Sequence, residues 1–186
     1  MSSLDEGAST TDQVDPSTVT IRYATASDRG ELQAIFNHEV TSSTSSWEWL
    51  PLSNEDWHEW FQAHTDDDHV LLVAEVGGQV AGFAGYGSFR SKAGYVSTVE
   101  DSIFLHDRFQ RHGLGTALLA QLLAEARLRS VHSMVAAVTS ENQASLRLHT
   151  NLGFRQVGHL PQIGHKFGRW LDLTLLQIIL DDRAKP

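Results

Sequence analysis

The chain has 186 residues, which is enough for one domain with a substantial core and too short to expect two. Its 23 acidic and 14 basic side chains give a formal net charge of −9, so the long-range field repels nucleic acids and anionic membranes. Cysteine is absent, which excludes disulfides, thiolate metal sites and a cysteine nucleophile.

The N-terminal segment, residues 1–18, is expected to be a disordered tail. It consists mainly of Ser, Thr, Asp and Gly and buries too little apolar surface to offset its ordering entropy. It also lacks the basic-then-apolar layout of a signal peptide, and no apolar run in the chain approaches the length of a membrane span. We therefore expect a cytoplasmic protein with a single domain over residues 19–180 and a short C-terminal tail, 181–186.

The domain is predicted to begin with a strand and a helix. Val19–Tyr23 alternates as a short strand, and Thr25 or Ser27 can cap the helix that follows. The apolar face of this helix is Leu32, Ile35, Phe36 and Val40. Thr41–Ser46 is a run of Ser and Thr that should end the helix in a loop.

A second helix and a hairpin are predicted next. Ser53, with Asp56 three residues later, is a helix-start signal. The large apolar residues of this helix are Trp57, Trp60 and Phe61. His69–Val76 and Gln79–Tyr86 are apolar strands joined at Gly77–Gly78, a strong hairpin signal.

The second half alternates strands and helices. Tyr95–Leu105 is predicted to contain a strand, Thr116–Arg129 a helix with a leucine-rich stripe, and Ser133–Val138 another strand. Asn142–Asn151 reads as a helix, with Gly153 at the expected C-terminal stop.

The chain is predicted to close with two strands, Arg155–Leu160 and Leu171–Ile179, paired antiparallel across a long loop. The element order β-α-α-β-β-β-α-β-α-β-β mixes parallel crossovers with hairpins. A mixed central sheet flanked by helices, in the α/β (α+β) class, therefore follows.

The most informative stretch is Thr98–Leu118, where a strand leads into a Gly-rich turn that opens a helix. Such a turn leaves backbone N–H groups unpaired at the positive end of the helix, which is a ready site for a phosphate. A P-loop would need a lysine before Thr116, and a Rossmann fingerprint would need Gly or Ala at Leu118. Both of these nucleotide motifs are absent here.

Gln110–Gly115 follows the pattern Gln-x-x-Gly-x-Gly, directly after a strand that carries the acidic pair Glu100 and Asp101. This combination resembles the acetyl-CoA-binding signature of the GCN5-related N-acetyltransferases (GNAT superfamily). Other segments are most similar to the phosphinothricin and methionine sulfoximine N-acetyltransferase group: Phe36–Val40, Thr98–Ser102, Asn142–Ser145, Leu148–His149, Leu152–Phe154 and Lys166–Asp172. The resemblance covers residues 20–180 and implies the GNAT acyl-CoA N-acyltransferase fold, acetyl-CoA as cosubstrate without a metal, a small amine or amino-acid substrate, and a homodimer.

The resemblance also implies how acetyl-CoA would be held. Backbone N–H groups of the Gly-rich turn, aided by the following helix dipole, would bind the pyrophosphate, and the preceding strand would lie along the pantetheine arm. One strand N–H would face the thioester oxygen. The implied cofactor-binding residues are Ile103, Phe104, Leu105, Gln110, Arg111, His112, Gly113, Leu114, Gly115, Thr116, Asn142 and Ser145. The alternatives are a structural turn, a plain core strand and, for Asn142, a helix cap.

Glu100 is the candidate general base. An acid within an otherwise apolar strand is costly to bury, and such carboxylates tend to have raised pKa values suited to accepting a proton. The alternative is an acid that faces solvent or forms a salt bridge. Asp101 should point to the opposite face and is not expected to share the task. The resemblance makes His149 the candidate acid for the leaving thiolate, working with the glutamate, on a helix expected to present it partly to solvent.

The resemblance places the substrate pocket near the loop between the first two helices. Arg90 and Tyr95, just before the catalytic strand, would surround a carboxylate or phosphinate. Lys166, in the predicted late loop with Arg169, would add positive potential. The remaining wall would be Phe36, Asn37 and the Ser/Thr run up to Trp47. At the position of Trp47 the group commonly has phenylalanine. For Arg90, Lys92, Lys166 and Arg169 the alternative is an ordinary solvated loop.

Together with these residues, the resemblance implies direct acetyl transfer from acetyl-CoA to the α-amine of a small amino-acid-like molecule of the phosphinothricin, methionine sulfoximine or methionine sulfone type. Rival substrates are protein N-termini, arylalkylamines and polyamines, although a polyamine pocket should be lined with acids. A non-catalytic acyl-CoA-binding sensor is the rival of another class. The ten histidines show no His-x-x-x-His spacing with a partner acid, so a metal site is not predicted.

Overall fold

The computed structural model of the chain describes residues 18–65 and 69–185. The predicted tail therefore lies outside the described residues except for Thr18, whose carbonyl accepts a hydrogen bond from the Gly77 N–H (3.1 Å). The predicted C-terminal tail is tethered, because Asp181 bonds His132 (2.8 Å) and Arg183 bonds the Ser130 carbonyl (2.8 Å). No helix in the described part of the chain is both long and apolar enough to cross a bilayer.

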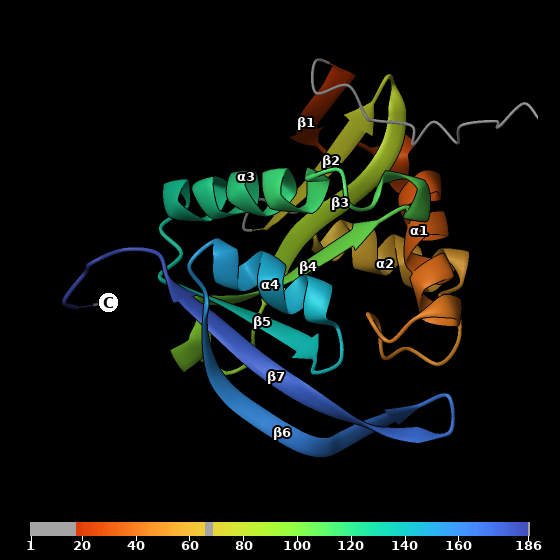
Figure 1. Ribbon diagram of the computed structural model, residues 1–186. Coiled ribbons are helices and arrows are strands. Elements are labelled where there is room, and N and C mark those ends of the chain that lie inside the picture. Colours follow the sequence, from red (N-terminus) through yellow and green to blue (C-terminus); the bar gives the residue numbers. More distant parts are fainter. Residues whose placement is uncertain (1–17, 66–68, 186) are drawn as a thin grey trace, which may run out of the picture.

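A seven-stranded sheet forms the middle layer (Figure 1), in the order β1-β2-β3-β4-β5-β7-β6. The strands are β1 (Val19–Tyr23), β2 (Val70–Val76), β3 (Gln79–Ser88), β4 (Thr98–Leu105), β5 (Ser133–Thr139), β6 (Arg155–Lys166) and β7 (Arg169–Ile179). Neighbouring strands are antiparallel except β4 and β5, which are parallel. The predicted mixed sheet is confirmed.

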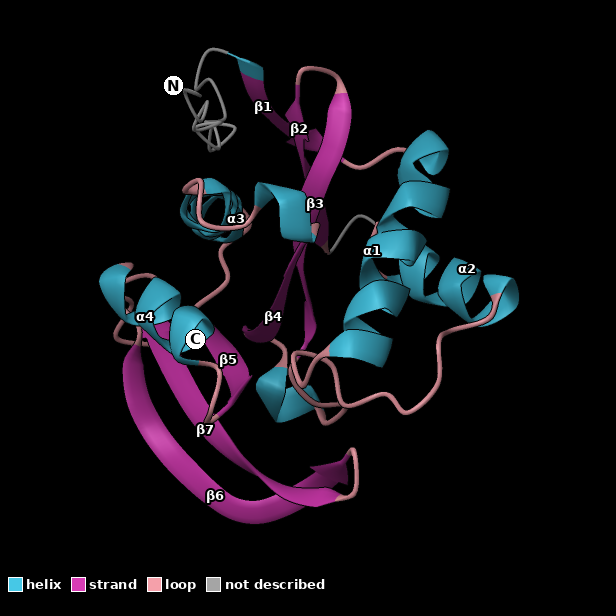
Figure 2. Cartoon of the chain, turned by 45° about the vertical axis from the view of Figure 1, so that its right-hand side comes forward, coloured by secondary structure: helices cyan, strands magenta, loops and turns pink. Residues whose placement is uncertain are grey.

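Four helices cover the two faces of the sheet (Figure 2). They are α1 (Arg29–Ser42), α2 (Asn54–Ala63), α3 (Leu114–Leu128) and α4 (Gln143–Asn151). Strand β2 shows the layering: Leu71 and Val73 pack with the α1–α2 core, while Leu72 and Ala74 pack with the α3 core. A strand buried on both faces must be apolar throughout, which explains its continuous hydrophobic run.

The long loop predicted between the last two strands is wrong. Strand β6 continues to Lys166 and pairs with β7 up to Lys166↔Arg169, across the turn Phe167–Gly168, where φ is 51° and 74°. Two register shifts interrupt β6, and most of its residues are exposed. A strand that buries neither face has no alternating apolar pattern, so its C-terminal half resembles a loop in the sequence.

Strands β4 and β5 pair only at one end. Their register runs from Thr98↔Ser133 to Glu100↔Val135, whereas β4 stays paired with β3 up to Leu105 and β5 with β7 up to Thr139. Beyond Glu100 the two strands therefore part. Their facing edges present backbone groups to an opening in the centre of the sheet.

Candidate active site

The opening between β4 and β5 continues into a cavity of about 1120 Å³. Its wall is built from the end of α1 and the loop after it, from β4 and β5, and from the first turns of α4. The predicted site residues in this lining are Phe36, Glu100, Ile103, Phe104, Leu105, Gln110, Arg111, Asn142, Ser145 and His149. The fold thus gathers residues from four separate elements around one space.

The cavity lining reaches Gln110 and Arg111 but not the predicted residues 112–116, which lead into α3. This helix begins at Leu114 rather than Thr116. Gly113 caps the helix at φ 81°, a left-handed conformation that glycine adopts without strain. The first intrahelical bond runs from Ala117 to Gly113 (3.1 Å), so the N–H groups of Leu114, Gly115 and Thr116 have no acceptor within the helix. These donors fit a pyrophosphate, since they lie at the positive helix end.

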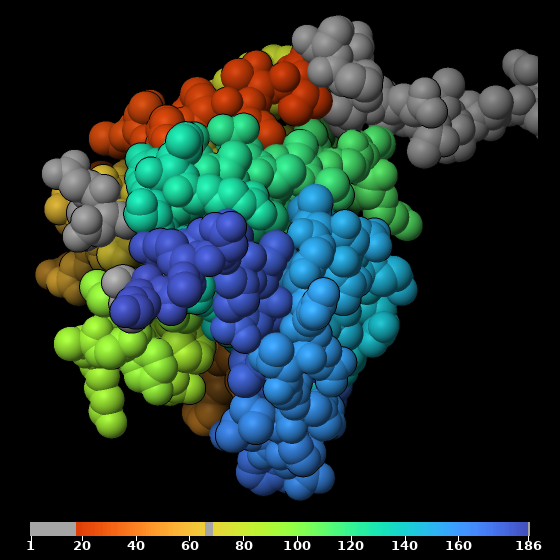
Figure 3. All heavy atoms as spheres, turned by 90° about the vertical axis from the view of Figure 1, so that its left-hand side faces the viewer, coloured from red at the N-terminus to blue at the C-terminus, as the bar shows by residue number. Residues whose placement is uncertain are grey.

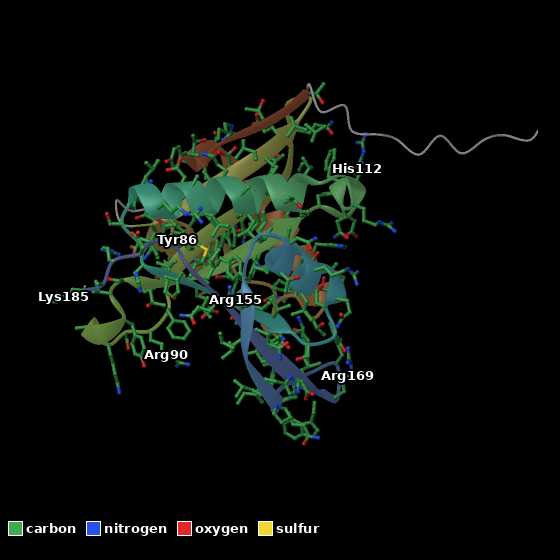
Figure 4. All side chains as sticks on the ribbon, turned by 60° about the vertical axis from the view of Figure 1, so that its left-hand side comes forward. Tyr86, Arg90, His112, Arg155, Arg169 and Lys185 are labelled. Atoms are coloured by element: carbon green, nitrogen blue, oxygen red, sulfur yellow. The ribbon has the colours of Figure 1, made fainter. Side chains whose placement is uncertain are left out.

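The side chains at this cradle have differing environments. Leu114 is buried with Phe109 and Ala81, so only its backbone is available to a ligand. Arg111, with φ 64°, lines the cavity, and His112 lies at the N-terminal end of α3 (Figure 4). A diphosphate would therefore meet mainly backbone N–H groups and one guanidinium.

Strand β4 forms the middle of the site. Phe104 packs edge-on against Phe36 at 5.1 Å between ring centroids and lies 5.3 Å from Phe83. Ile103 and Leu105 pack against the core on the other face. The side chains are thus part of the core, while the strand edge that faces β5 remains open to a ligand.

Glu100 lies at the last β4–β5 pair, where the strands part. By strand alternation its side chain shares the face of Phe104 and therefore points toward α1 and α2. Burial raises the pKa of Glu100 above its ordinary value; the Asp101 charge adds to the rise and Arg90 partly opposes it. A half-buried carboxyl with a raised pKa is suited to accepting a proton.

His149 is buried against Asp101, contrary to the expected partial exposure. Its Nε2 lies 3.0 Å from Asp101 Oδ2, and its Nδ1 lies 2.8 Å from the Ser145 carbonyl and 3.4 Å from the Ser145 hydroxyl. Desolvation lowers the pKa of His149, but Asp101 and the Ser145 carbonyl outweigh it, so the pKa is raised. The predicted opposite orientation of Glu100 and Asp101 is confirmed, yet Asp101 has a role in the site that the sequence analysis missed.

The loop after α1 is fastened across the open side of the sheet. Trp47 donates its indole N–H to the Thr139 hydroxyl (2.7 Å), and that hydroxyl donates to the Thr44 carbonyl (2.6 Å). Thr44 also donates to Glu141 (2.9 Å), which Arg169 holds through two contacts of 2.6 Å. These hydrogen bonds hold the loop in place as one wall of the cavity.

Lys166 also binds the loop after α1, and its predicted place in a late loop is wrong. It is the last residue of β6, is buried, and donates from Nζ to the Ser46 carbonyl (2.5 Å). Desolvation lowers the pKa of Lys166, while Glu39 and Glu48 oppose the shift. Its ammonium group therefore holds the loop after α1, which forms the cavity wall, without lining the cavity itself.

The other predicted substrate contacts lie outside the cavity lining. Asn37 uses its amide to brace the segment before α2, through two bonds with Leu52 (2.8 and 3.1 Å). Arg90 lies on the β3–β4 connection, which stands out from the body of the protein (Figures 3 and 4). Its guanidinium lies 4.9 Å from the Phe89 ring, against which Tyr95 also packs (5.7 Å).

The charge of the cavity lining differs from the expected basic pocket. The acids in the lining are Glu39, Glu48, Glu100, Asp101, Asp107 and Glu141. Asp101 and Glu141 are neutralised by the partners described above, and Asp107 lies 2.9 Å from His38. Within the described residues, no group of three or more His, Asp or Glu side chains is arranged to hold a metal ion.

Comparison with known proteins gives a consistent result. The acetyltransferase (GNAT) family matches residues 32–154. The chain is 42% identical over 168 residues to the L-amino acid N-acyltransferase MnaT of Escherichia coli, covering 90% of this chain and 98% of that protein. It is 41% identical, with the same coverage, to the L-methionine sulfoximine/L-methionine sulfone acetyltransferase of Salmonella typhimurium. The solved structure of yncA from Salmonella typhimurium with its cofactor acetyl-CoA has a TM-score of 0.88 at 41% identity, covering 91% of this chain and 98% of that one.

Proposed function

Because the chain belongs to the acetyltransferase (GNAT) family, we propose that its acetyl-CoA-dependent N-acetyl transfer acts on the α-amine of small amino-acid-like molecules. The leading class is methionine sulfoximine, methionine sulfone and phosphinothricin. The names of the two relatives above, one with L-amino acids and one with L-methionine sulfoximine and L-methionine sulfone, support the first two members. Phosphinothricin is included because of the resemblance of the sequence segments to that group. The observation that carries the proposal is the position of Glu100, inside the cavity at the point where β4 and β5 part.

In the proposed reaction, Glu100 accepts a proton from the substrate ammonium, directly or through water. The neutral amine attacks the thioester carbonyl, whose oxygen is met by a backbone N–H on the open edge of β4. The N–C bond forms, the C–S bond breaks, and the thiolate takes a proton. Backbone donors of Arg111–Thr116 hold the pyrophosphate, and Asn142 and Ser145 border the pantetheine arm on the α4 side.

Arg90 and Tyr95 are proposed to recognise the carboxylate or phosphinate at the mouth of the site. The chain path supports this position, because Arg90 follows Phe89, whose N–H bonds the Thr98 carbonyl (3.3 Å), two residues before Glu100. Phe36 forms the apolar wall. Asn37 and Lys166 act indirectly, by holding the loops that shape the cavity.

A cationic amine such as a polyamine is the second candidate substrate. Glu39 and Glu48 line the cavity, and their charges act on Lys166. Glu39 also accepts a bond from Ser43 (2.5 Å), which orients its carboxylate. This acidic wall is the feature expected of a pocket for a second positive charge.

A thiol-release assay with acetyl-CoA and a panel of amino-acid analogues, polyamines and N-terminal peptides tests the proposal. We expect the sulfoximine, sulfone and phosphinic analogues to give the highest kcat/KM. Preference for a polyamine would shift the assignment to the acidic wall. If calorimetry detects no acetyl-CoA binding, the proposed reaction is wrong. The alternative of an acyl-CoA-binding sensor is then excluded as well.

A cytoplasmic homodimer completes the proposal. The β6–β7 hairpin exposes apolar side chains, each more than half exposed: Val157, Ile163, Phe167 and Trp170. Apolar side chains exposed along one hairpin favour a covering partner, and a second copy of the chain is the proposed cover. Sedimentation at micromolar concentration should give twice the monomer mass of 20.6 kDa.

A further inference from the structure

The side chains of Ser145, His149 and Asp101 form a connected line from the cavity into the core. We infer that they act as a proton relay for the departing thiolate, in which the Ser145 hydroxyl is the group that touches the sulfur. His149 resupplies that hydroxyl, and Asp101 is a positioning residue for the imidazole. This inference rests on the proposed function, because it needs a thiol leaving group.

The hydrogen-bond partners of His149 define its protonation. Nδ1 lies 2.8 Å from the Ser145 carbonyl, which can only accept, so Nδ1 carries a hydrogen. Nε2 lies 3.0 Å from the carboxylate of Asp101. We therefore assign the further proton to Nε2, so that an imidazolium faces the Asp101 carboxylate. In this form the pair stores a proton that can be given away.

Ser145 offers the more open path for that proton. His149 and Asp101 also border the cavity, but their side chains are only 4% and 2% exposed. The second carboxylate oxygen, Asp101 Oδ1, is buried without a hydrogen-bond partner among the described residues, and Phe154 packs edge-on against the imidazole at 5.0 Å. Ser145 is only partly buried and lines the cavity, with its hydroxyl 3.4 Å from Nδ1.

The charged surroundings of the ring are simple. From β4, Asp101 is the ionisable group in contact with it, whereas the neighbouring Glu100 points to the other face of the sheet. From α4 the ring meets Ser145, and from the segment after α4 it meets Phe154. Removing the Asp101 charge should therefore leave the ring without any compensating anion in contact.

When the C–S bond breaks, sulfur keeps the electron pair and takes the hydroxyl proton of Ser145. The hydroxyl takes the Nδ1 proton of His149, and the remaining proton stays between Nε2 and Asp101. Each turnover removes two protons from the substrate ammonium; one restores the relay and the other reaches solvent.

The His149–Asp101 pair can be tested without any turnover. Imidazole ¹⁵N NMR of the protein alone, with His149→Gln to assign the signal, should show both ring nitrogens protonated to a higher pH than in a free histidine. Asp101→Asn should move this titration to lower pH. A neutral His149 ring at pH 6 in the unmodified protein, or an unchanged titration in Asp101→Asn, would overturn the relay.

The serine is tested by kinetics with a leaving-group control. Ser145→Ala should lower kcat by roughly 10²-fold at saturating acetyl-CoA, and Ser145→Thr, which keeps a hydroxyl, should recover most of it. With the selenium analogue of acetyl-CoA the defect of Ser145→Ala should shrink, because a selenolate leaves without being protonated.

Three outcomes overturn the relay: full activity in Ser145→Ala, no recovery in Ser145→Thr, or the same defect with the thioester and the selenoester. Unmodified protein that transfers acetyl to no amine would instead overturn the proposed function and the thiolate step with it. In that case the NMR titration still decides whether Asp101 sets the protonation of His149.

Discussion

The indole of Trp47 lies directly over the backbone of Gly164, so that a Cβ atom at position 164 would overlap the ring. This contact joins the loop after α1 to β6. It places the indole N–H against Thr139 at the end of β5. Because Trp47 also lines the cavity, the contact sets the shape of the substrate side of the site.

Gly164→Ala should therefore displace Trp47. We expect a raised KM for the amine and a loss of about 1–3 kcal/mol in the free energy of unfolding, as for an overpacked core. Gly158→Ala on the same strand is the matched control, since its Cβ would meet Leu175 at an ordinary 3.5 Å. Urea unfolding and steady-state kinetics measure both effects. Equal behaviour of the two variants would contradict the role of the Trp47 contact.

Glu100→Gln should lower kcat and raise stability together. The raised pKa of Glu100 means that its ionised form is disfavoured in the folded protein, so the carboxylate costs stability above its folded-state pKa. The melting temperature of Glu100→Gln should exceed that of the unmodified protein at pH 8, and the gap should close as pH falls and Glu100 becomes protonated. A variant with full kcat at every pH would show that Glu100 is not the base.

Lys166→Met should loosen the cavity wall. The substitution keeps the apolar stem but removes the donor to the Ser46 carbonyl, a charged hydrogen bond worth about 1–3 kcal/mol when buried. We expect lower stability and a raised KM for uncharged and acidic amine substrates alike. A KM effect confined to acidic substrates would instead assign Lys166 to direct carboxylate binding. Arg169→Met, which removes only the exposed pair with Glu141, should cost less stability.

Asp28 should make the protein sensitive to acid. Arg22 holds it through contacts of 2.7 Å to both carboxylate oxygens, and this interaction lowers the pKa of Asp28 from 3.8 to about 2. The stabilisation, about 2 kcal/mol, is present above pH 4 and is lost as pH falls toward 2. Denaturation of Asp28→Asn and the unmodified protein should differ at pH 7 and converge at low pH. A difference that stays constant with pH would contradict this account.

Local pattern was sufficient to predict the order of helices and strands, the Gly-rich turn before α3 and the opposite orientation of Glu100 and Asp101. Helix periodicity, capping residues and strand alternation depend on near neighbours in the chain, so they are legible in the sequence. The family resemblance rests on the same local segments. It placed the cofactor cradle and the candidate base in one stretch, Thr98–Leu118.

Tertiary structure alone decided which side chains act together. Asp101 and His149 are 48 residues apart, and Lys166 and Ser46 are 120 residues apart, so no periodic pattern could pair them. The length of the β6–β7 hairpin was hidden for a different reason, because β6 buries neither face and carries no alternating pattern. Local sequence therefore predicted the order of the elements and the chemical groups available where β4 and β5 part. The packing of α4 against β4 decided the partner of His149, and the packing of the loop after α1 decided the partner of Lys166. Such contacts depend on how distant segments of the chain are brought together.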